Sequence, residues 1–413
     1  MADDKFAYVS IFPLGDKNNL FAPQTACYFI TRFAKIYTPI VILLAIVIAI
    51  FPPLLGLGSW HDFIMRSLIF LVASCPCALV ISIPLSFFSA IGANAKIGVL
   101  IKGSKYIEIL SKVKAVCFDK TGTLTSGRLK VDEVVSVSGY TKEDILSITA
   151  GIEQASTHPI AACIVAYANT NQNLKVENAR ELAGMGLSAE YNGKTYYCGG
   201  QNLLSKMKIE IGDLPEANVY LCEENQIIGY ITLMEEIAEE NLPLISRLHQ
   251  AGVERVVMLT GDNEKNAEKI AKKYGVTEYR AGLLPKDKVA VVEEVKNDGA
   301  ITLFAGDGIN DAPVIAAADI GVSMGLGSEI ANVSSDVILA GNQLSALPNA
   351  IRLSKRSMRV VRANILFALS IKFGVLLLGA LGFATMWMAV FADIGVTILS
   401  VLNSMRILRF KGE

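Results

Sequence analysis

Three short acidic segments in the middle of the chain carry the residue types that phosphoryl transfer requires. One apolar run ends at Asp119, a second leads to Thr260-Gly261-Asp262, and a third leads to Asp307. One carboxylate can attack a phosphoryl group and form an aspartyl phosphate, while others hold Mg²⁺ through oxygen. A hydroxyl, backbone amides and a lysine, for which Lys288 is a candidate, can stabilise charge on the transferring group. One Asp-Gly pair alone would indicate a turn, but three segments that each close an apolar run favour a phosphoryl-transfer site.

A second set of reactive residues lies within strongly apolar runs. Cys75-Pro76-Cys77 interrupts one run, and Lys372 and Asp393 lie inside two later ones. Proline bends a helix, so both thiols can face one cavity, and thiolates select soft or borderline ions. Two thiolates and a carboxylate suit Zn²⁺, Cd²⁺ or Pb²⁺ better than Cu⁺. The alternatives are a kinked helix with two packed cysteines, and a purely structural bridge between Lys372 and Asp393.

Four apolar runs must position this second set. They lie at about 36–58, 63–92, 364–382 and 384–402, and each supplies the roughly 20 apolar residues that a bilayer-spanning helix needs. Lys and Arg flank the two pairs of runs but are absent from the short links within each pair, which predicts cytoplasmic chain ends and a cytoplasmic middle region. We therefore expect an integral protein of the cell membrane rather than a large soluble protein with buried helices. With 38 basic and 39 acidic residues, the chain has no charge excess that indicates a nucleic acid partner.

The first set must be positioned by the middle region. Apolar strands that alternate with helices, for example at 239–251 and 263–274, predict a parallel, doubly wound sheet. Ligands of such sheets bind beyond the carboxyl ends of the strands, where all three acidic segments fall. The seven cysteines show no paired framework, so we expect free thiols in a reducing cytosol.

Three motifs in these segments resemble those of P-type ATPases. Asp119-Lys-Thr-Gly-Thr-Leu-Thr125 is similar to the family's phosphorylation signature, and Thr260-Gly-Asp262 and Gly306-Asp-Gly-Ile-Asn-Asp-Ala-Pro313 are similar to its two hinge-region motifs, in the same order. The resemblance implies a haloacid-dehalogenase-like phosphorylation domain with an inserted α+β nucleotide-binding domain, joined to about four transmembrane helices. The expected boundaries are a transmembrane hairpin at 29–110, the phosphorylation domain at 111–126 and 233–345, the nucleotide-binding domain at 127–232, and a second hairpin at 346–413.

The resemblance also implies roles for the matched residues. Asp119 would accept the γ-phosphoryl group of ATP, and Mg²⁺ would be held by Asp119, Asp307 and the carbonyl of Thr121. Contacts to the phosphoryl group would come from Thr260, Lys288 and Asn310. The other members of the expected catalytic set are Lys120, Gly261, Asp262 and Asp311.

Four residues of the inserted segment are similar to the nucleotide site of the heavy-metal-transporting branch. Glu153 and His158 would contact the adenine end of ATP, and Gly184 and Gly186 would allow close approach of the backbone. Taken singly, the Gly-x-Gly pattern is typical of any tight turn and His-Pro of a helix start.

The membrane residues resemble those of the zinc-, cadmium- and lead-exporting subgroup. Cys75, Cys77 and Asp393 would bind the transported ion, with Lys372 as the counter-charge and Asn364 nearby in sequence. A copper-exporting relative is the alternative, but it would carry Tyr, Asn, Met and Ser on the last two helices, a pattern that Lys372 and Asp393 do not suit.

One family motif is absent from the sequence. No Thr-Gly-Glu occurs, although the family's actuator domain uses it to hydrolyse the aspartyl phosphate, and residues 1–28 look like an unrelated leader. We therefore expect a partial transporter, or one that works with a separate chain that supplies the actuator, and slow dephosphorylation of this chain alone.

The resulting hypothesis is ATP-driven export of Zn²⁺, Cd²⁺ or Pb²⁺, with the lipid membrane, ATP and the soft divalent ion as partners. One alternative is an ATP-phosphorylated, metal-responsive membrane module that does not pump. Another is a membrane-tethered phosphatase of the haloacid dehalogenase type, which is disfavoured because Thr121 stands where such enzymes carry a second Asp.

Overall fold

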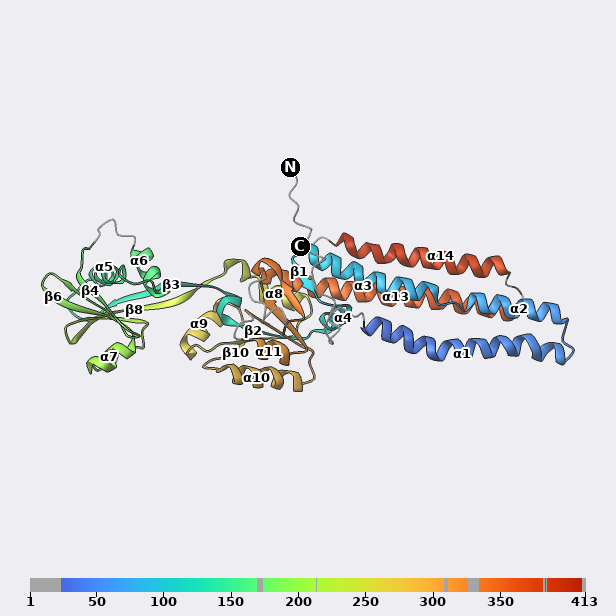
Figure 1. Ribbon diagram of the computed structural model, residues 1–413, viewed down its shortest axis with the longest axis horizontal. Helices are drawn as coiled ribbons and strands as arrows, with labels where there is room; N and C mark the ends of the chain where they lie inside the picture. Colours follow the sequence, from blue (N-terminus) through green and yellow to red (C-terminus); the bar gives the residue numbers. More distant parts are fainter. Residues whose placement is uncertain are drawn as a thin grey trace, which may run out of the picture.

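The protein is elongated, with a helical bundle at one end, a parallel sheet in the middle and an antiparallel sheet at the other end (Figure 1). This computed structural model describes residues 24–168, 174–212, 214–307, 311–325, 334–381, 383 and 385–410. Asn310 and most of the expected leader at 1–28 lie outside the described residues.

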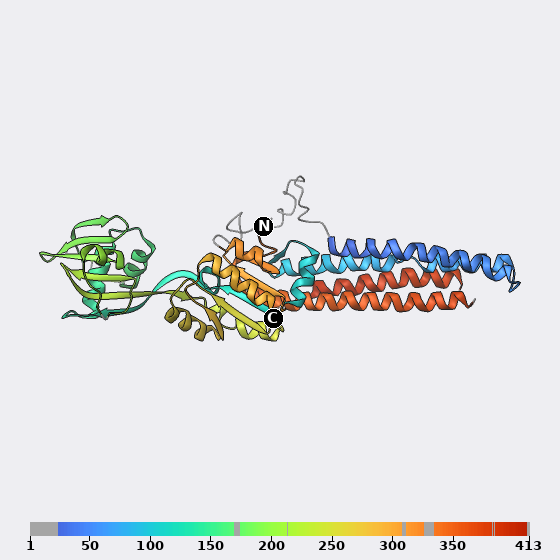
Figure 2. The ribbon, with the colours of Figure 1, turned by 90° about the horizontal axis from the view of Figure 1, so that it is seen from below.

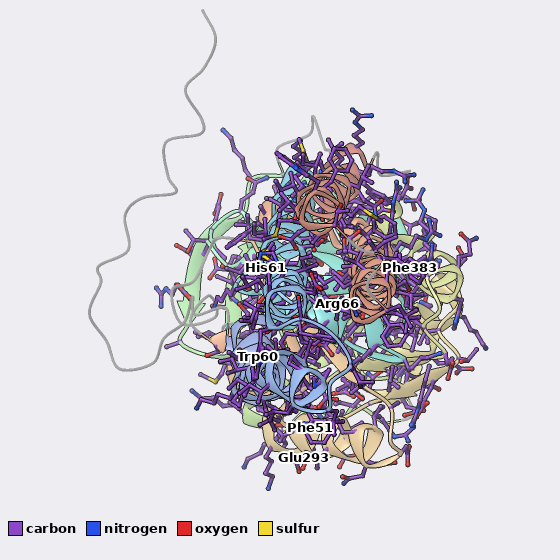
Figure 3. All side chains as sticks on the ribbon, turned by 90° about the vertical axis from the view of Figure 1, so that its right-hand side faces the viewer. Phe51, Trp60, His61, Arg66, Glu293 and Phe383 are labelled. Carbon is purple, nitrogen blue, oxygen red and sulfur yellow. A yellow bond between two sulfur atoms is a disulfide. The ribbon has the colours of Figure 1, made fainter. Side chains whose placement is uncertain are left out.

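Long apolar helices form the bundle. They are α1 (Gln24–Leu54), α2 (Trp60–Ala73), α3 (Cys77–Lys96), α13 (Leu347–Ala380) and α14 (Met386–Met405). Among the described residues, four stretches are long and apolar enough to cross a membrane: Lys35–Leu54, Trp60–Lys96, Leu344–Gly379 and Met386–Arg409. Figure 3 shows the bundle from its far end, where Phe51, Trp60 and Phe383 lie near the helix ends. The membrane-helical part of the predicted fold is confirmed.

The second apolar run is a broken helix, as its proline predicts. Helix α2 ends at Ala73 and α3 begins at Cys77, so the break falls on Ser74, Cys75 and Pro76. The third run extends further than predicted, because α13 begins at Leu347 and its first turns are buried against the middle part of the molecule. This extension joins the bundle to the parallel sheet without a flexible link.

The middle part is a seven-stranded sheet with the order β1-β13-β12-β11-β2-β9-β10. Neighbouring strands are parallel except β1 and β13, so the predicted parallel sheet is confirmed. The central strands are buried along their whole length, which explains their continuous apolar sequence. The strands are β1 (Val99–Ile101), β2 (Ala115–Asp119), β9 (Arg255–Leu259), β10 (Glu278–Arg280), β11 (Thr302–Gly306), β12 (Ile320–Met324) and β13 (Val337–Leu339).

Short helices accompany this sheet. They are α4 (Ser104–Lys112), α8 (Leu244–Gln250), α9 (Glu264–Tyr274), α10 (Pro285–Asn297) and α11 (Ala312–Ala317). The predicted helix at 239–251 is split into a 3₁₀ turn at Glu239–Asn241 and α8, because Pro243 between them has no N–H to donate. The helix predicted at 263–274 is present as α9, with the Asn263 side chain accepting from the Asn266 N–H at its start.

The third part is a six-stranded sheet with the order β3-β8-β7-β6-β5-β4, all antiparallel. Its long strands β3 and β8 pair with each other and carry the chain out of the parallel-sheet part and back (Figure 2). The strands are β3 (Thr125–Ser136), β4 (Glu177–Leu182), β5 (Gly186–Tyr191), β6 (Lys194–Gly199), β7 (Val219–Glu223) and β8 (Gln226–Ile237), and the helices are α5 (Lys142–Glu153), α6 (Pro159–Ala168) and α7 (Gln201–Met207).

Candidate functional site

The three acidic segments meet at one edge of the parallel sheet. Strands β11, β2 and β9 are neighbours in the sheet and run in the same direction. Asp119 is the last residue of β2, while Asp307 directly follows β11 and Thr260 directly follows β9. Their side chains therefore start from the same end of three adjacent strands, as the sequence pattern predicts.

Lys288 joins two of the carboxylates at this edge. Its Nζ lies 2.6 Å from Oδ1 of Asp119 and 2.9 Å from Oδ1 of Asp311. The lysine comes from the first turns of α10, which starts at Pro285 and is fixed by the Asp287 carboxylate accepting from the Leu284 N–H. All three charged side chains are mostly buried, so their interaction is only weakly screened by water.

Burial and the neighbouring charges raise the pKa of Asp119 strongly. Burial and the neighbouring charge of Asp311 raise the pKa of Asp119 to about 6, although Lys288 opposes the rise. Burial lowers the pKa of Lys288, but the charges and hydrogen bonds of Asp119 and Asp311 outweigh it, so the net shift is upward and the lysine stays protonated. The single positive charge of Lys288 therefore cannot neutralise both Asp119 and Asp311.

This excess of negative charge fits the Mg²⁺ ion that the family implies. Asp307 lies beside the loop after Asp119, because a Cβ built on Gly122 would be 3.8 Å from Cβ of Asp307 and 3.9 Å from its Oδ2. Gly122 has a φ of +66°, which favours glycine and lets the loop turn at Thr121. Two carboxylates and a backbone carbonyl form the all-oxygen donor set that Mg²⁺ prefers.

The segment after β9 supports the same loop. Thr260 is buried, and its Oγ1 accepts from the N–H of Asp262 at 3.1 Å. A Cβ on Gly261 would lie only 3.3 Å from the carbonyl oxygen of Leu283, so this position has little room for a side chain. The carboxylate of Asp262 is engaged by Lys120, at 3.0 Å.

Glu235 completes this group, although the sequence reasoning missed it. Its carboxylate lies 2.9 Å from Nζ of Lys120, accepts from Oγ1 of Thr121 at 2.9 Å, and accepts from Oγ1 of Thr125. Lys120 is only 2% exposed, so it requires such an anion. Glu235 belongs to no phosphoryl-transfer motif, and the one available signal was its place near the end of a strand that returns to the parallel sheet.

The four candidate nucleotide residues lie in the antiparallel-sheet part. Glu153 is the buried last residue of α5, while His158 is exposed and its Nδ1 accepts from the N–H of Ile160 at the start of α6. Burial raises the pKa of Glu153, and a hydrogen bond from Cys198 and the charge of His158 oppose this rise. Glu153 and His158 thus flank the short link between α5 and α6.

The two glycines have different structural requirements. Gly184 forms a turn with a φ of +72° and has open space where a Cβ would point. At Gly186 a Cβ would lie 2.1 Å from the carbonyl oxygen of Cys198, so the pairing of β5 with β6 itself demands glycine. Only Gly184 offers open space to a ligand.

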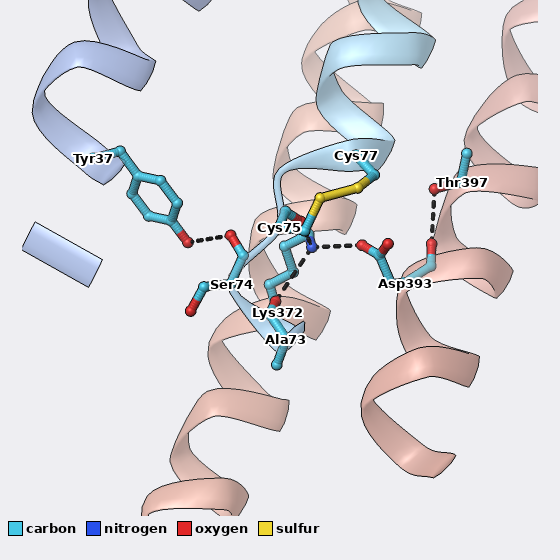
Figure 4. Close-up of a disulfide and its surroundings, with 8 residues drawn as sticks. All are labelled: Tyr37, Ala73, Ser74, Cys75, Cys77, Lys372, Asp393 and Thr397. Carbon is cyan, nitrogen blue, oxygen red and sulfur yellow. Dashed lines mark hydrogen bonds and ion pairs between the residues drawn. A yellow bond between two sulfur atoms is a disulfide. The ribbon is translucent and has the colours of Figure 1, made fainter. Parts of the chain in front are cut away.

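The ion-site candidates converge at the helix break in the bundle. Sulfur atoms of Cys75 and Cys77 and a carboxylate oxygen of Asp393 lie within 4.8 Å of one another. Figure 4 shows Lys372 from α13 reaching across to Asp393 on α14, with 2.7 Å between Nζ and Oδ1. The same ammonium donates to the carbonyl of Cys75 and, at 3.3 Å, to the carbonyl of Ala73, both beside the break.

The expectation of free cysteine thiols is wrong at this site. Cys75 and Cys77 form a disulfide, whereas Cys117, Cys163, Cys198 and Cys222 are free. Their Cα atoms are 5.5 Å apart, a separation within the usual range for a disulfide. Two thiolate ligands therefore require reduction of this bond.

Comparisons with known proteins agree with the fold. A family model described as haloacid dehalogenase-like hydrolase matches residues 113–319. A cadmium, zinc and cobalt-transporting ATPase of Bacillus subtilis is 45% identical over 395 residues, which are 93% of this chain and 56% of that protein. A zinc-transporting ATPase of Synechocystis sp. is 43% identical over 92% of this chain and 54% of that protein. This chain thus spans about half the length of these relatives.

A solved structure extends the likeness to three dimensions. The crystal structure of a zinc-transporting PIB-type ATPase in the E2.Pi state superposes with a TM-score of 0.81 and 36% identity, covering 97% of this chain and 65% of that one. The match includes the bundle as well as both sheets, since it extends over nearly the whole chain. The chain belongs to the haloacid dehalogenase-like hydrolases, and over nearly its whole length it is similar to heavy-metal-transporting P-type ATPases.

Proposed function

We propose that this chain uses ATP to drive export of a soft divalent metal ion such as Zn²⁺ or Cd²⁺, through phosphorylation of Asp119. The observation that carries the proposal is the shared lysine at the sheet edge, where Lys288 contacts both Asp119 and Asp311. The transport activity of the relatives supports the cargo, as does the meeting of two cysteines and Asp393 inside the bundle. Copper is disfavoured because a carboxylate and a lysine replace sulfur ligands.

In the proposed phosphorylation step, a carboxylate oxygen of Asp119 attacks the γ-phosphorus of ATP. An acyl phosphate forms, the bond to the bridging oxygen breaks, and ADP leaves. Asp119 must be ionised to attack, and Lys288 orients the carboxylate and offsets negative charge on the transferring group. Asp119, Asp307 and the Thr121 carbonyl would hold Mg²⁺, which when bound would neutralise part of the phosphate charge.

We assign the adenine end of ATP to the inserted segment, expected at 127–232. Glu153, His158 and Gly184 lie there, and strands β3 and β8 link them to the parallel sheet (Figure 1). In this proposal Thr260 and Asn310 contact the phosphoryl group, and Gly261 and Asp262 keep the loop and Lys120 in place. Both chain ends and both sheets lie in the cytoplasm, in line with the flanking basic residues of the apolar runs.

In the membrane, Cys75, Cys77 and Asp393 hold the ion once a thiol reductant has reduced the disulfide and been oxidised in its place, and Lys372 releases Asp393 to the ion. The salt bridge between Lys372 and Asp393 keeps the carboxylate from being an unpaired charge before the ion arrives. The lysine then remains held by the carbonyls at the helix break.

Acid-stable labelling by γ-³²P-ATP tests the proposal. Wild-type chain in reduced form should give a hydroxylamine-labile phosphoprotein that responds to Zn²⁺ or Cd²⁺, and Asp119→Asn should give none. The control is Asp298→Asn, which removes an exposed carboxylate paired with Arg255. Labelling of the Asp119→Asn variant would refute the proposed nucleophile, and labelling without metal uptake into sealed vesicles would support the non-pumping module instead.

A further inference from the structure

Cys198 is a buried thiol that the proposed mechanism does not use. It lies on β6, in the interior of the antiparallel-sheet part, and has no exposed surface. Its Sγ donates a hydrogen bond to Oε1 of Glu153, with 3.1 Å between the two atoms. Burial, followed by the charge of Glu153, raises the pKa of this thiol, so it stays protonated and remains a donor.

This hydrogen bond fixes one oxygen of a buried carboxylate. Glu153 ends α5, and its side chain is 7% exposed, so an unpartnered orientation would cost free energy. Because the thiol holds Oε1, a ligand of this carboxylate would have to use Oε2. The β6 strand thereby determines which way the carboxylate of Glu153 points.

The same stretch of β6 also determines the shape of the glycine loop. The carbonyl of Cys198 occupies the space where a side chain on Gly186 would lie, and Cys198 pairs in register with Leu187 on β5. A Cβ on the next residue, Gly199, would lie 2.2 Å from the carbonyl oxygen of Met185. One residue therefore contacts both halves of the proposed nucleotide site.

We propose that Cys198 is a positioning residue for adenine nucleotide binding, acting through its hydrogen bond to Glu153. The inference rests on the proposed function, because it assumes that Glu153 contacts the nucleotide. It makes Cys198 a donor to a carboxylate, rather than a thiol that reacts or binds metal. A serine at this position retains a donor, whereas an alanine does not.

The test measures the ATP concentration that gives half-maximal phosphorylation of Asp119, using the full chain. Cys198→Ala should raise this concentration about five-fold, as expected for the loss of one hydrogen bond, with the maximal level unchanged. Cys198→Ser should restore it to within about two-fold. Cys222→Ala is the matched control, since Cys222 is also fully buried, on the adjacent strand β7, and should stay within about two-fold of wild type.

Binding of ADP by calorimetry, which requires no phosphoryl transfer, provides a second measurement for the same variants. An unchanged Cys198→Ala variant, or a Cys198→Ser variant as impaired as Cys198→Ala, overturns the inference. Glu153→Ala separates this failure from that of the proposed function. If Glu153→Ala leaves nucleotide affinity unchanged, the adenine role of Glu153 is wrong; if it weakens affinity while Cys198→Ala does not, only the role of Cys198 is wrong.

Discussion

A buried lysine holds a carboxylate at both the proposed phosphorylation site and the proposed ion site. At the sheet edge Lys288 contacts Asp119 and Asp311, and in the bundle Lys372 contacts Asp393. Lys288 faces an excess of negative charge, because Asp307 also raises the pKa of Asp119. Lys372 pairs with the single carboxylate of Asp393 and also donates hydrogen bonds to two backbone carbonyls.

The two sites can therefore accept a cation in different ways. An excess of carboxylates leaves room for a cation to be added while the lysine stays, which suits phosphoryl transfer. A balanced pair leaves no spare charge, so an ion that binds Asp393 must displace Lys372 from it. If the bundle binds an ion as proposed, binding would therefore require Lys372 to move away from Asp393.

Removing Lys288 should have the largest effect on phosphorylation. Lys288→Ala leaves Asp119 and Asp311 without their shared cation, and we expect the phosphorylation rate to fall about 100- to 1,000-fold. Rapid-quench labelling with ATP measures the rate. Lys286→Ala changes an exposed lysine on the same helix and should have no effect. A Lys288→Ala rate within ten-fold of wild type would show that phosphorylation does not depend on the charge of Lys288.

Loss of Asp393 from its pair with Lys372 should change how phosphorylation depends on metal. Asp393→Asn removes one of three candidate ligands, and we expect the metal concentration for half-maximal phosphorylation to rise at least about ten-fold, with a smaller effect on the rate at saturation. Metal titration of the reduced chain checks this, with the exposed Asp62→Asn as control. Equal sensitivity to metal in Asp393→Asn and wild type would leave the pair a structural bridge.

The newly found acid beside Lys120 should matter less. Glu235→Gln weakens contacts to Lys120, Thr121 and Thr125, and because Asp262 still pairs with Lys120 we expect the phosphorylation rate to fall about ten-fold. Glu236→Gln, at the adjacent exposed position, is the matched control. Identical rates for the two variants would show that Glu235 only fills space.

The smallest expected effect is a shift in pH dependence. Asp119 reacts as the ionised carboxylate, so the phosphorylation rate should rise with pH around the raised pKa of about 6. Asp311→Asn removes a repelling charge and leaves Lys288 to Asp119 alone, so the midpoint should move about one unit lower, toward the ordinary value of 3.8. Single-turnover labelling between pH 5 and 8, a window chosen as about one to two units around that value, measures it. A midpoint that does not move would show that Asp311 is not a source of the excess negative charge.

The sequence predicts the parallel sheet well because its evidence is local. Strands β2, β9 and β11 each end at, or within three residues of, an acidic residue. Strands such as β2 and β11 are buried throughout, so their apolar composition marks them. The helix break was predictable for the same reason, since Pro76 removes a backbone donor wherever the fold places it.

Contacts between distant residues were not predictable in this way. Glu235 meets Lys120 only because β8 returns beside β3, and nothing in either segment specifies that register. The contact of Cys198 with Glu153 likewise depends on how α5 packs on the sheet. The disulfide was missed because cysteine count and compartment say nothing of the turn geometry at Pro76.

The paired strands β3 and β8 have a consequence for the encounter of ATP with Asp119. Because both crossings between the sheets run through this ribbon, a nucleotide held near Glu153 is tethered to the same molecule as its acceptor. Tethering replaces a bimolecular collision by an internal search, with an effective concentration on the order of millimolar for a short link. In the proposed function, the ribbon would therefore keep the γ-phosphate within reach of Asp119 at any concentration of protein.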